Sequence, residues 1–216
     1  MNSVANGKVY ARSPFRRLYV QAAAGDAGGA IGAALVAAGP RRARMSHAYW
    51  GPWFSDEDIG RLLEDRRAEL QSQGCRIERM PDEGALVRRT AEAVAGGAVV
   101  GWFQGRMEWG PRALGNRSIV CDPRRADMKD LLNAKIKRRE SFRPFAPSIL
   151  REAVPDWFET DDDVPFMMQV HQIRAERRPG IPAVTHVDGS GRLQTVSREA
   201  NPRYYALIEA FRALTG

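Results

Sequence analysis

Cysteine, histidine and long apolar runs are scarce in this sequence of 216 residues. It contains two cysteines, Cys75 and Cys121, and three histidines. Two cysteines are too few for a disulfide scaffold. The longest apolar stretches, residues 30–38 and 98–103, are far shorter than the roughly 20 residues that a membrane-crossing helix needs. No apolar core of a signal peptide follows the first charges. These absences predict a protein of the reducing cytoplasm with no membrane partner.

Acidic residues are outnumbered by basic ones. The chain has 33 Lys and Arg against 26 Asp and Glu, a net charge of +7 and a pI near 9.9. With 44% hydrophobic and 27% charged residues, the composition is that of a globular protein and excludes disorder as the main state. The positive charge favours anionic partners, either phosphorylated small molecules or nucleic acid. A solvated basic surface explains the charge equally well at this point.

Hydrophobic periodicity predicts an alternating α/β fold without internal repeats. Residues 40–54 are rich in Pro, Arg, Trp and Gly and predict an irregular linker. The predicted helices are 30–35, 55–72, 82–95, 126–138 and 202–214. The predicted strands are 18–20, 75–79, 98–104, 118–121, 145–150, 165–173, 183–187 and 193–196.

A glycine-rich turn, residues 25–29, separates the first predicted strand from the first helix. Such a turn directs backbone N–H groups and a helix N-terminus to one place, which suits an anion. Asp26 in this turn is a candidate ligand for a metal or a hydroxyl group. Taken from the residues alone, a tight connection with Asp26 as the helix N-cap is the favoured interpretation.

The chemistry-bearing residues concentrate in the segment 105–118, Gly-Arg-Met-Glu-Trp-Gly-Pro-Arg-Ala-Leu-Gly-Asn-Arg-Ser. Glycine and proline fix an irregular backbone directly after a predicted buried strand, and three arginines and a glutamate project from it. This arrangement is typical of a rigid cradle for an oxyanion or a phosphate. A plain solvated loop would not need so much glycine and proline.

Two further segments carry candidate cations. Lys135 and Arg139 lie at a helix end, where the helix dipole explains them. Arg143 lies between two phenylalanines before a strand, and the dipole does not explain it. Residues 186–192 predict a strand, a turn and a returning strand with Arg192 at the turn exit. His186 in this segment is expected to be structural, because no second His or Cys lies at a metal-ligand spacing.

These segments together resemble the C-terminal region of the O-carbamoyltransferases of antibiotic and nodulation-factor biosynthesis. The matching stretches are 105–119, 133–147, 185–189 and 192–196, while 2–7 and 25–35 are similar to the end of the family's N-terminal domain. The resemblance covers virtually the whole chain. It implies that residues 1–39 end an actin-like carbamoyl-transfer domain and that residues 40–216 form a YrdC-like domain, a mixed twisted sheet with flanking helices.

The resemblance also implies a two-stage reaction. In the family, the YrdC-like domain converts carbamoyl phosphate and ATP to carbamoyl-adenylate, and the actin-like domain, with bound iron or another divalent metal, moves the carbamoyl group onto a substrate hydroxyl. Matching motif positions imply that Arg112, Lys137, Arg143 and Arg192 contact ATP and carbamoyl phosphate, with Lys137 and Arg143 in catalytic roles. Asp26 matches an aspartate that binds the metal.

Two departures from the family pattern shape the expectation. The family's metal-binding histidine pair lies upstream of the Asp26 motif, and His47, His171 and His186 do not occupy that place. A final strand with an Asn-Thr-Ser-type loop is also missing. We therefore expect a truncated or split carbamoyltransferase, incomplete at its C-terminus, whose partners are small-molecule substrates and a complementing N-terminal carbamoyltransferase chain.

Two alternatives stay open. The chain could be a basic YrdC-like module that binds nucleic acid, either tRNA or double-stranded RNA, or an inactive gene fragment. Nucleic acid is the less favoured partner, because aromatic side chains are not spaced as stacking platforms for bases.

Overall fold

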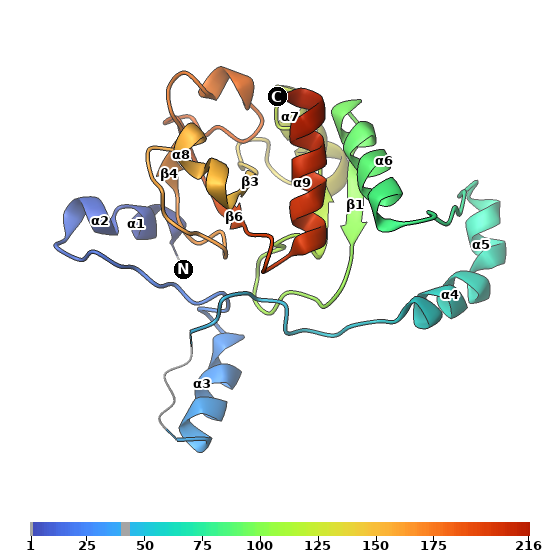
Figure 1. Ribbon diagram of the computed structural model, residues 1–216, viewed down its shortest axis with the longest axis horizontal. Helices are drawn as coiled ribbons and strands as arrows, with labels where there is room; N and C mark the ends of the chain where they lie inside the picture. The colour runs from blue at the N-terminus through green and yellow to red at the C-terminus, as the bar shows by residue number, and fades with distance from the viewer. Residues whose placement is uncertain (1, 40–43) are drawn as a thin grey trace.

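The computed structural model describes residues 2–39 and 44–216. Figure 1 shows a central body of helices and short strands, from which helical segments extend on several sides. The fold is a mixture of helices and small sheets and belongs to the α/β class. Residues 40–43 lie outside the described residues. They follow the domain boundary predicted after residue 39 and include the start of the predicted linker.

Helices account for most of the regular structure. The α-helices are α1 (Ser3–Gly7), α2 (Val9–Arg12), α3 (Gly28–Ala37), α4 (Asp56–Asp65), α5 (Arg67–Ser72), α6 (Glu83–Ala95), α7 (Met128–Leu131), α8 (Val154–Trp157) and α9 (Pro202–Thr215). A π-helix, η1 (Leu132–Lys137), continues α7, and the 3₁₀ turns are η2 (Arg151–Ala153) and η3 (Arg178–Gly180). The strands are β1 (Val100–Phe103), β2 (Arg117–Val120), β3 (Ser148–Leu150), β4 (His171–Gln172), β5 (Ser190–Gly191) and β6 (Gln194–Val196).

The predicted helices are confirmed, and side-chain caps explain where three of them, α4, α6 and α9, begin. The Ser55 side chain and Asp58 form a capping box at the start of α4. Asp82 caps α6, and Asn201 caps α9 by accepting from the Tyr204 N–H. The helix predicted over 55–72 is divided in two at Arg66. These three starts therefore depend on residues within one helical turn.

The strands form three separate two-stranded sheets, not the single mixed sheet that was expected. β1 pairs with β2 and β4 with β5 in antiparallel fashion, while β3 and β6 are parallel, with Ser148 opposite Gln194. Strands of two to four residues give each pair one short ladder. Turns and irregular backbone replace most of the strands predicted over 165–173 and 183–187. Among the described residues, no sheet contains a third strand.

Two predicted strands are wrong because their backbone has no ladder partner. Residues 18–20 belong to no strand, and the Leu18 N–H donates to the Tyr10 hydroxyl at 3.0 Å. Residues 75–79 are exposed, and their charged side chains face solvent, with Glu78 paired to Arg89 at 3.0 Å. The irregular linker is confirmed over residues 44–54. Strand propensity alone is thus insufficient where no second strand lies alongside.

The main core lies between α6, α9 and the short strands. α9 contributes Tyr204, Tyr205 and Leu207, which pack with Trp102 of β1 and with buried residues of α6, β3 and β6. Gly115 has a φ of +108°, and a Cβ there would collide with the Tyr204 ring. The loop after β1 can therefore pass directly over α9 only with glycine at this position.

The extensions bury little. α3, α4 and α5 contain no buried residue, and Val36 in α3 is 84% exposed. Figure 1 shows α3 below the body and α4 and α5 to its right. Among the described residues, no helix combines the length and the apolar character needed to cross a bilayer.

Candidate functional site

The loop that follows β1 is wrapped around a single carboxylate. Glu108 Oε1 accepts the backbone N–H groups of Leu114 at 2.6 Å, Asn116 at 2.9 Å and Arg117 at 3.2 Å. The sequence predicted that Glu108 projects from the loop, and this is wrong. Its charge is used to satisfy the N–H groups that the irregular backbone leaves unpaired. The loop is rigid for that reason, and these three N–H groups are not free for a ligand.

Of the three arginines in residues 105–118, two are engaged by the protein's own backbone. Arg106 donates to the Gly51 carbonyl at 3.3 Å. Arg117 donates to the carbonyls of Gln104 at 2.6 Å and Gly105 at 3.1 Å, and its guanidinium lies over the Phe103 ring. Arg112 forms no such bond among the described residues. The structure thus leaves Arg112 as the loop arginine available to a ligand.

The parallel pair β3 and β6 brings the three motif segments together. The Gln194 side chain donates from Nε2 to the Leu114 carbonyl at 2.9 Å, which ties the loop to the strand that follows Arg192. The Gln194 N–H donates to the Pro147 carbonyl at 3.0 Å, where the segment after η1 enters β3. Gln194 is 2% exposed, so water does not compete for these bonds. All three motifs meet at the N-terminal ends of these two strands.

A buried asparagine places a further cation at this junction. Asn133 in η1 is completely buried, and its Oδ1 accepts from Arg139 Nε at 2.7 Å. Its Nδ2 donates to the carbonyls of Ser141 at 3.2 Å and Arg143 at 3.0 Å. The Arg139 guanidinium also lies 4.8 Å from the centre of the Phe145 ring. The helix end and the following loop are therefore folded back on Asn133, and Arg139 is held in place.

Arg112, Arg139 and Arg192 form one electropositive cluster, which we call the arginine cluster. Burial, with the positive charges of Arg112 and Arg139, lowers the pKa of Arg192 to about 10. The Nε atoms of Arg112 and Arg192 are buried and bond to no partner among the described residues. None of the three arginines pairs with an acidic side chain in the described part of the chain. Like charges held together in this way favour an anionic ligand.

The four predicted phosphate contacts do not all share this environment. Arg112 and Arg192 lie in the cluster, and their contacts with phosphate stay predictions. Lys137 is exposed at the end of η1, and Arg143 is exposed and paired with Glu140 at 2.9 Å. Their roles stay predictions. In the sequence analysis, the helix dipole accounts for the position of Arg139 at a helix end. The structure instead places Arg139 in the arginine cluster.

Asp26 lies in an exposed turn before α3. It is not the helix N-cap, because Ala27 occupies that position and makes no side-chain bond. The turn contacts the loop after β1, since Trp109 Nε1 donates to the Ala27 carbonyl at 3.1 Å. No group of three or more His, Cys, Asp or Glu side chains within residues 2–39 and 44–216 could hold a metal. These residues alone do not make an iron site, and the role of Asp26 as a metal ligand stays a prediction.

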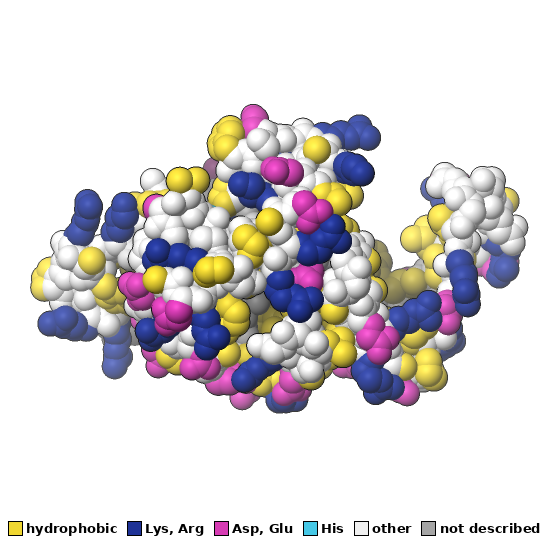
Figure 2. Space-filling view, turned by 90° about the horizontal axis from the view of Figure 1, so that it is seen from above, with side chains coloured by type: hydrophobic (Ala, Val, Ile, Leu, Met, Phe, Trp, Pro, Cys, Tyr) yellow, Lys and Arg dark blue, Asp and Glu magenta, His cyan; other side chains and the backbone are white. Residues whose placement is uncertain are grey.

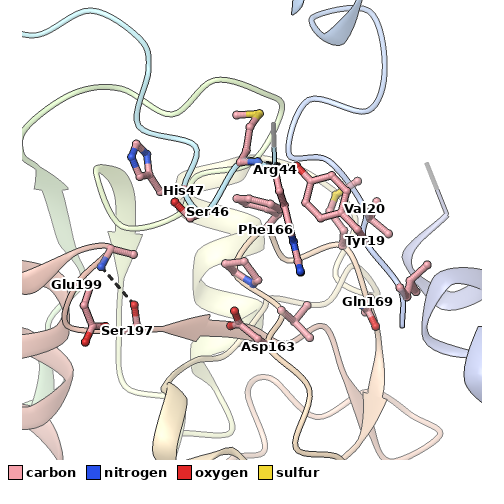
Figure 3. A pocket seen from close by; sticks show the side chains of 16 residues that line it. Tyr19, Val20, Arg44, Ser46, His47, Asp163, Phe166, Gln169, Ser197 and Glu199 are labelled. Atoms are coloured by element: carbon pink, nitrogen blue, oxygen red, sulfur yellow. Dashed lines mark hydrogen bonds between the residues drawn. The ribbon is translucent and has the colours of Figure 1, made fainter. Parts of the chain in front are cut away.

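A groove of about 430 Å³ lies at the other end of β6 and contains none of the predicted site residues. Figure 3 shows Arg44 pointing into it. The Arg44 guanidinium lies 5.0 Å from the centre of the Tyr19 ring, and Asp163 and Glu199 also line the groove. Thr195 of β6 donates to Asp163 at 2.6 Å. The mixed charges of this groove differ from the purely positive arginine cluster.

Comparison with known proteins matches both parts of the chain to one family. Residues 91–216 match the family described as Carbamoyltransferase C-terminus, and residues 1–35 match Carbamoyltransferase N-terminus. The first match contains all three members of the arginine cluster.

Several curated relatives align over most or all of the chain. The chain is 47% identical over its whole length to nodulation protein NolNO of Sinorhizobium fredii, of which it covers 32%. It is 44% identical over 99% of its length to nodulation protein NolO of Bradyrhizobium diazoefficiens, of which it covers 39%. It is 36% identical over 91% of its length to a 3'-hydroxymethylcephem-O-carbamoyltransferase of Streptomyces clavuligerus, of which it covers 35%. The chain thus spans between about a third and two-fifths of the length of these relatives.

Proposed function

The chain belongs to the carbamoyltransferase family, and on that premise we propose that it is the part of an ATP-dependent O-carbamoyltransferase that binds carbamoyl phosphate and ATP and forms carbamoyl-adenylate. The observation that carries this proposal is the arginine cluster, where Arg112, Arg139 and Arg192 have no acidic partner among the described residues. Both substrates are multiply charged anions, and their phosphates would supply the missing partners.

The proposed reaction makes clear demands on these side chains. Hydrolysis of carbamoyl phosphate frees carbamate and inorganic phosphate. A carbamate oxygen then bonds to the α-phosphorus of ATP while the bond to pyrophosphate breaks. Negative charge grows on the leaving pyrophosphate, and fixed guanidinium groups stabilise it without reorganising. Lys137 at the end of η1 and Arg143 in the segment that follows are proposed to join the cluster, since both side chains are exposed and the surface pair of Arg143 with Glu140 is easily exchanged.

The domain organisation is part of the proposal. The body would be a YrdC-like domain, and α1 to α3 would belong to an actin-like domain whose remainder supplies metal ligands besides Asp26. Transfer of the carbamoyl group to a substrate hydroxyl would then need that remainder, either upstream in the same polypeptide or as a complementing chain. The match of residues 1–35 to the family's N-terminus supports this division.

Calorimetric titration of the chain with ATP and with carbamoyl phosphate tests the proposal. Replacing Arg112 or Arg192 by Ala should weaken binding by about 1.5–3 kcal/mol, because each removes a charge-assisted contact. Arg174→Ala is the matched control, since Arg174 donates to the Pro155 carbonyl away from the cluster. Unchanged affinity in both cluster variants would remove the arginine cluster from the site.

A product assay tests the second stage. The chain alone should yield no carbamoylated acceptor, whereas a longer chain that includes the remainder of the family's N-terminal domain should do so with ATP, carbamoyl phosphate and iron. Turnover by the chain alone would contradict the proposed division of labour.

Nucleic-acid binding is the competing function, and the salt dependence of binding distinguishes it from the proposed function. Figure 2 shows Lys and Arg interspersed with Asp and Glu on the face it displays, which does not favour one continuous basic surface there. Binding to tRNA should weaken steeply with salt, because each phosphate contact releases counterions. A wide preference for tRNA over ATP at near-physiological salt would favour this alternative.

A further inference from the structure

The turn before Arg192 contains a hydroxyl whose single proton can be assigned. Ser190 Oγ lies 2.5 Å from Asp188 Oδ1, and the Ser190 N–H donates to the same oxygen at 3.1 Å. These two bonds lower the pKa of Asp188, so its carboxyl group is ionised near neutral pH and can only accept. The Ser190 hydroxyl proton is therefore directed to Asp188.

This assignment determines which nitrogen of His186 carries a proton. His186 Nδ1 lies 3.0 Å from the same Ser190 Oγ. Because that hydroxyl already donates to Asp188, its oxygen accepts from Nδ1–H. Burial lowers the pKa of His186, and the positive charge of Arg192 lowers it further, while the negative charge of Asp188 opposes this shift. The net effect is a lowered pKa, so the ring is neutral near pH 7. A neutral ring with Nδ1–H has a lone pair on Nε2.

His186 Nε2 is buried and has no partner among the described residues. The Nε–H groups of Arg112 and Arg192 share that condition. The charge of Arg192 acts on His186, and that of Arg112 acts on Arg192, so the three side chains lie in one region. Buried polar atoms in native proteins are nearly always bonded, so three unpaired ones in one region require an explanation. Together they offer two donors and one acceptor. A simple oxyanion such as fully ionised phosphate would satisfy the donors and leave the acceptor unpaired.

We propose that His186 is a specificity-determining residue, whose Nε2 accepts a hydrogen bond from the amide NH₂ of a carbamoyl group while Arg112 and Arg192 bind oxygen atoms of the same ligand. This inference rests on the proposed function and deepens it. It explains how the site distinguishes carbamoyl phosphate from other acyl phosphates. Acetyl phosphate has a similar shape but a methyl group in place of the NH₂ group. A site that offers a buried acceptor to the ligand's N–H group discriminates against an analogue that lacks this group.

The test is calorimetric titration of the full chain with carbamoyl phosphate, acetyl phosphate and inorganic phosphate. The unmodified chain should bind carbamoyl phosphate about three- to tenfold more tightly than acetyl phosphate, the range expected for one hydrogen bond. His186→Phe keeps an aromatic ring without an acceptor and should abolish this preference, while its affinity for inorganic phosphate stays unchanged. His186→Gln restores an acceptor and should recover part of the preference.

Several results would overturn the inference. They are equal affinity of the unmodified chain for the two acyl phosphates, an unchanged preference in His186→Phe, or an equal loss of affinity for all three ligands, which indicates a structural role. Failure of the unmodified chain to bind any of them would instead remove the proposed function, and the inference with it. Should His186→Phe not fold, the ¹⁵N chemical shifts of His186 decide, since carbamoyl phosphate should shift the Nε2 signal and acetyl phosphate should not.

Discussion

At the residue scale, arginine performs different tasks within one small region. Arg117 stabilises the loop after β1 by donating to its carbonyls, and Arg143 forms an exposed pair with Glu140. Arg112 and Arg192 have buried Nε atoms without partners among the described residues. The residue type therefore says little about function here. The partners that surround each guanidinium decide whether it stabilises the fold or attracts a ligand.

Replacing Arg192 should stabilise the unliganded chain. In the folded state the pKa of Arg192 is lowered to about 10, so its charged form is disfavoured there relative to the unfolded chain. Below pH 10 the side chain is charged in both states and this cost is constant. Arg192→Met should therefore raise Tm between pH 6 and 9, by about 2–4 °C for each kcal/mol removed. Above pH 10 the folded parent loses the proton first, and the difference should shrink.

Thermal unfolding measured across this pH range checks the prediction. Arg143→Met is the control and should leave Tm unchanged, because that side chain is exposed. A lower Tm in Arg192→Met would show that packing of the arginine stem outweighs repulsion within the arginine cluster.

Arg139 should matter more for anion binding than its place at a helix end suggests. Asn133 and the Phe145 ring hold its guanidinium beside Arg192. Arg139→Ala should weaken binding of ATP by roughly 10-fold or more, the loss expected for one charge-assisted contact. Lys135→Ala, from the exposed side of the same helix end, should leave affinity unchanged. Equal affinities for both variants, measured by titration, would exclude Arg139 from the site.

At the element scale, the residues that cap the helices differ in the other hydrogen bonds that they form. Asp82 caps α6 at the exposed surface. Asn201 caps α9 and also belongs to a buried polar network, donating to Asn116 at 2.8 Å and to the Tyr49 hydroxyl at 3.0 Å. Burial raises the pKa of Tyr49 to about 12, so the hydroxyl stays protonated and donates to the Leu114 carbonyl at 2.9 Å. The start of α9 is thus joined to the loop that carries Arg112.

Two alanine substitutions separate the cap from the network. Asp82→Ala should reduce the free energy of unfolding by about 1 kcal/mol, the usual value of a cap. Asn201→Ala should cost about 1–3 kcal/mol more, because it leaves buried partners unsatisfied. Urea denaturation of both variants measures the difference. Equal losses would mean that the network adds nothing beyond the cap.

At the scale of the whole molecule, the extensions expose apolar side chains that a packed domain would cover. Val36 in α3 and Leu62 in α4 are 84% and 58% exposed, and Trp50, Trp53 and Phe54 are exposed along the segment before α4. Exposed apolar side chains promote association. Because residues 1–35 match the family's N-terminal part, we expect the remainder of that domain to cover α3.

The chain should associate in a concentration-dependent manner through these surfaces. Val36→Glu and Leu62→Glu should shift sedimentation towards the monomer, because a charge within an apolar contact is costly to bury. Val187→Glu is the control, since Val187 is an isolated exposed residue in a turn. A chain that sediments as a monomer at all concentrations would contradict the prediction.

The amino-acid sequence determined the helices, the motif segments and the family. Helix starts such as Ser55, Asp82 and Asn201 depend on contacts within one turn, so local patterns are sufficient to find them. Strand pairing and ligand-facing side chains depend on distant partners instead. The bond from Gln194 to Leu114 joins residues 80 positions apart, and the one from Asn201 to Asn116 joins residues 85 positions apart. Only the tertiary structure could therefore show that Glu108 turns inward, that Asn133 adds Arg139 to the cluster, and that the strands form separate pairs.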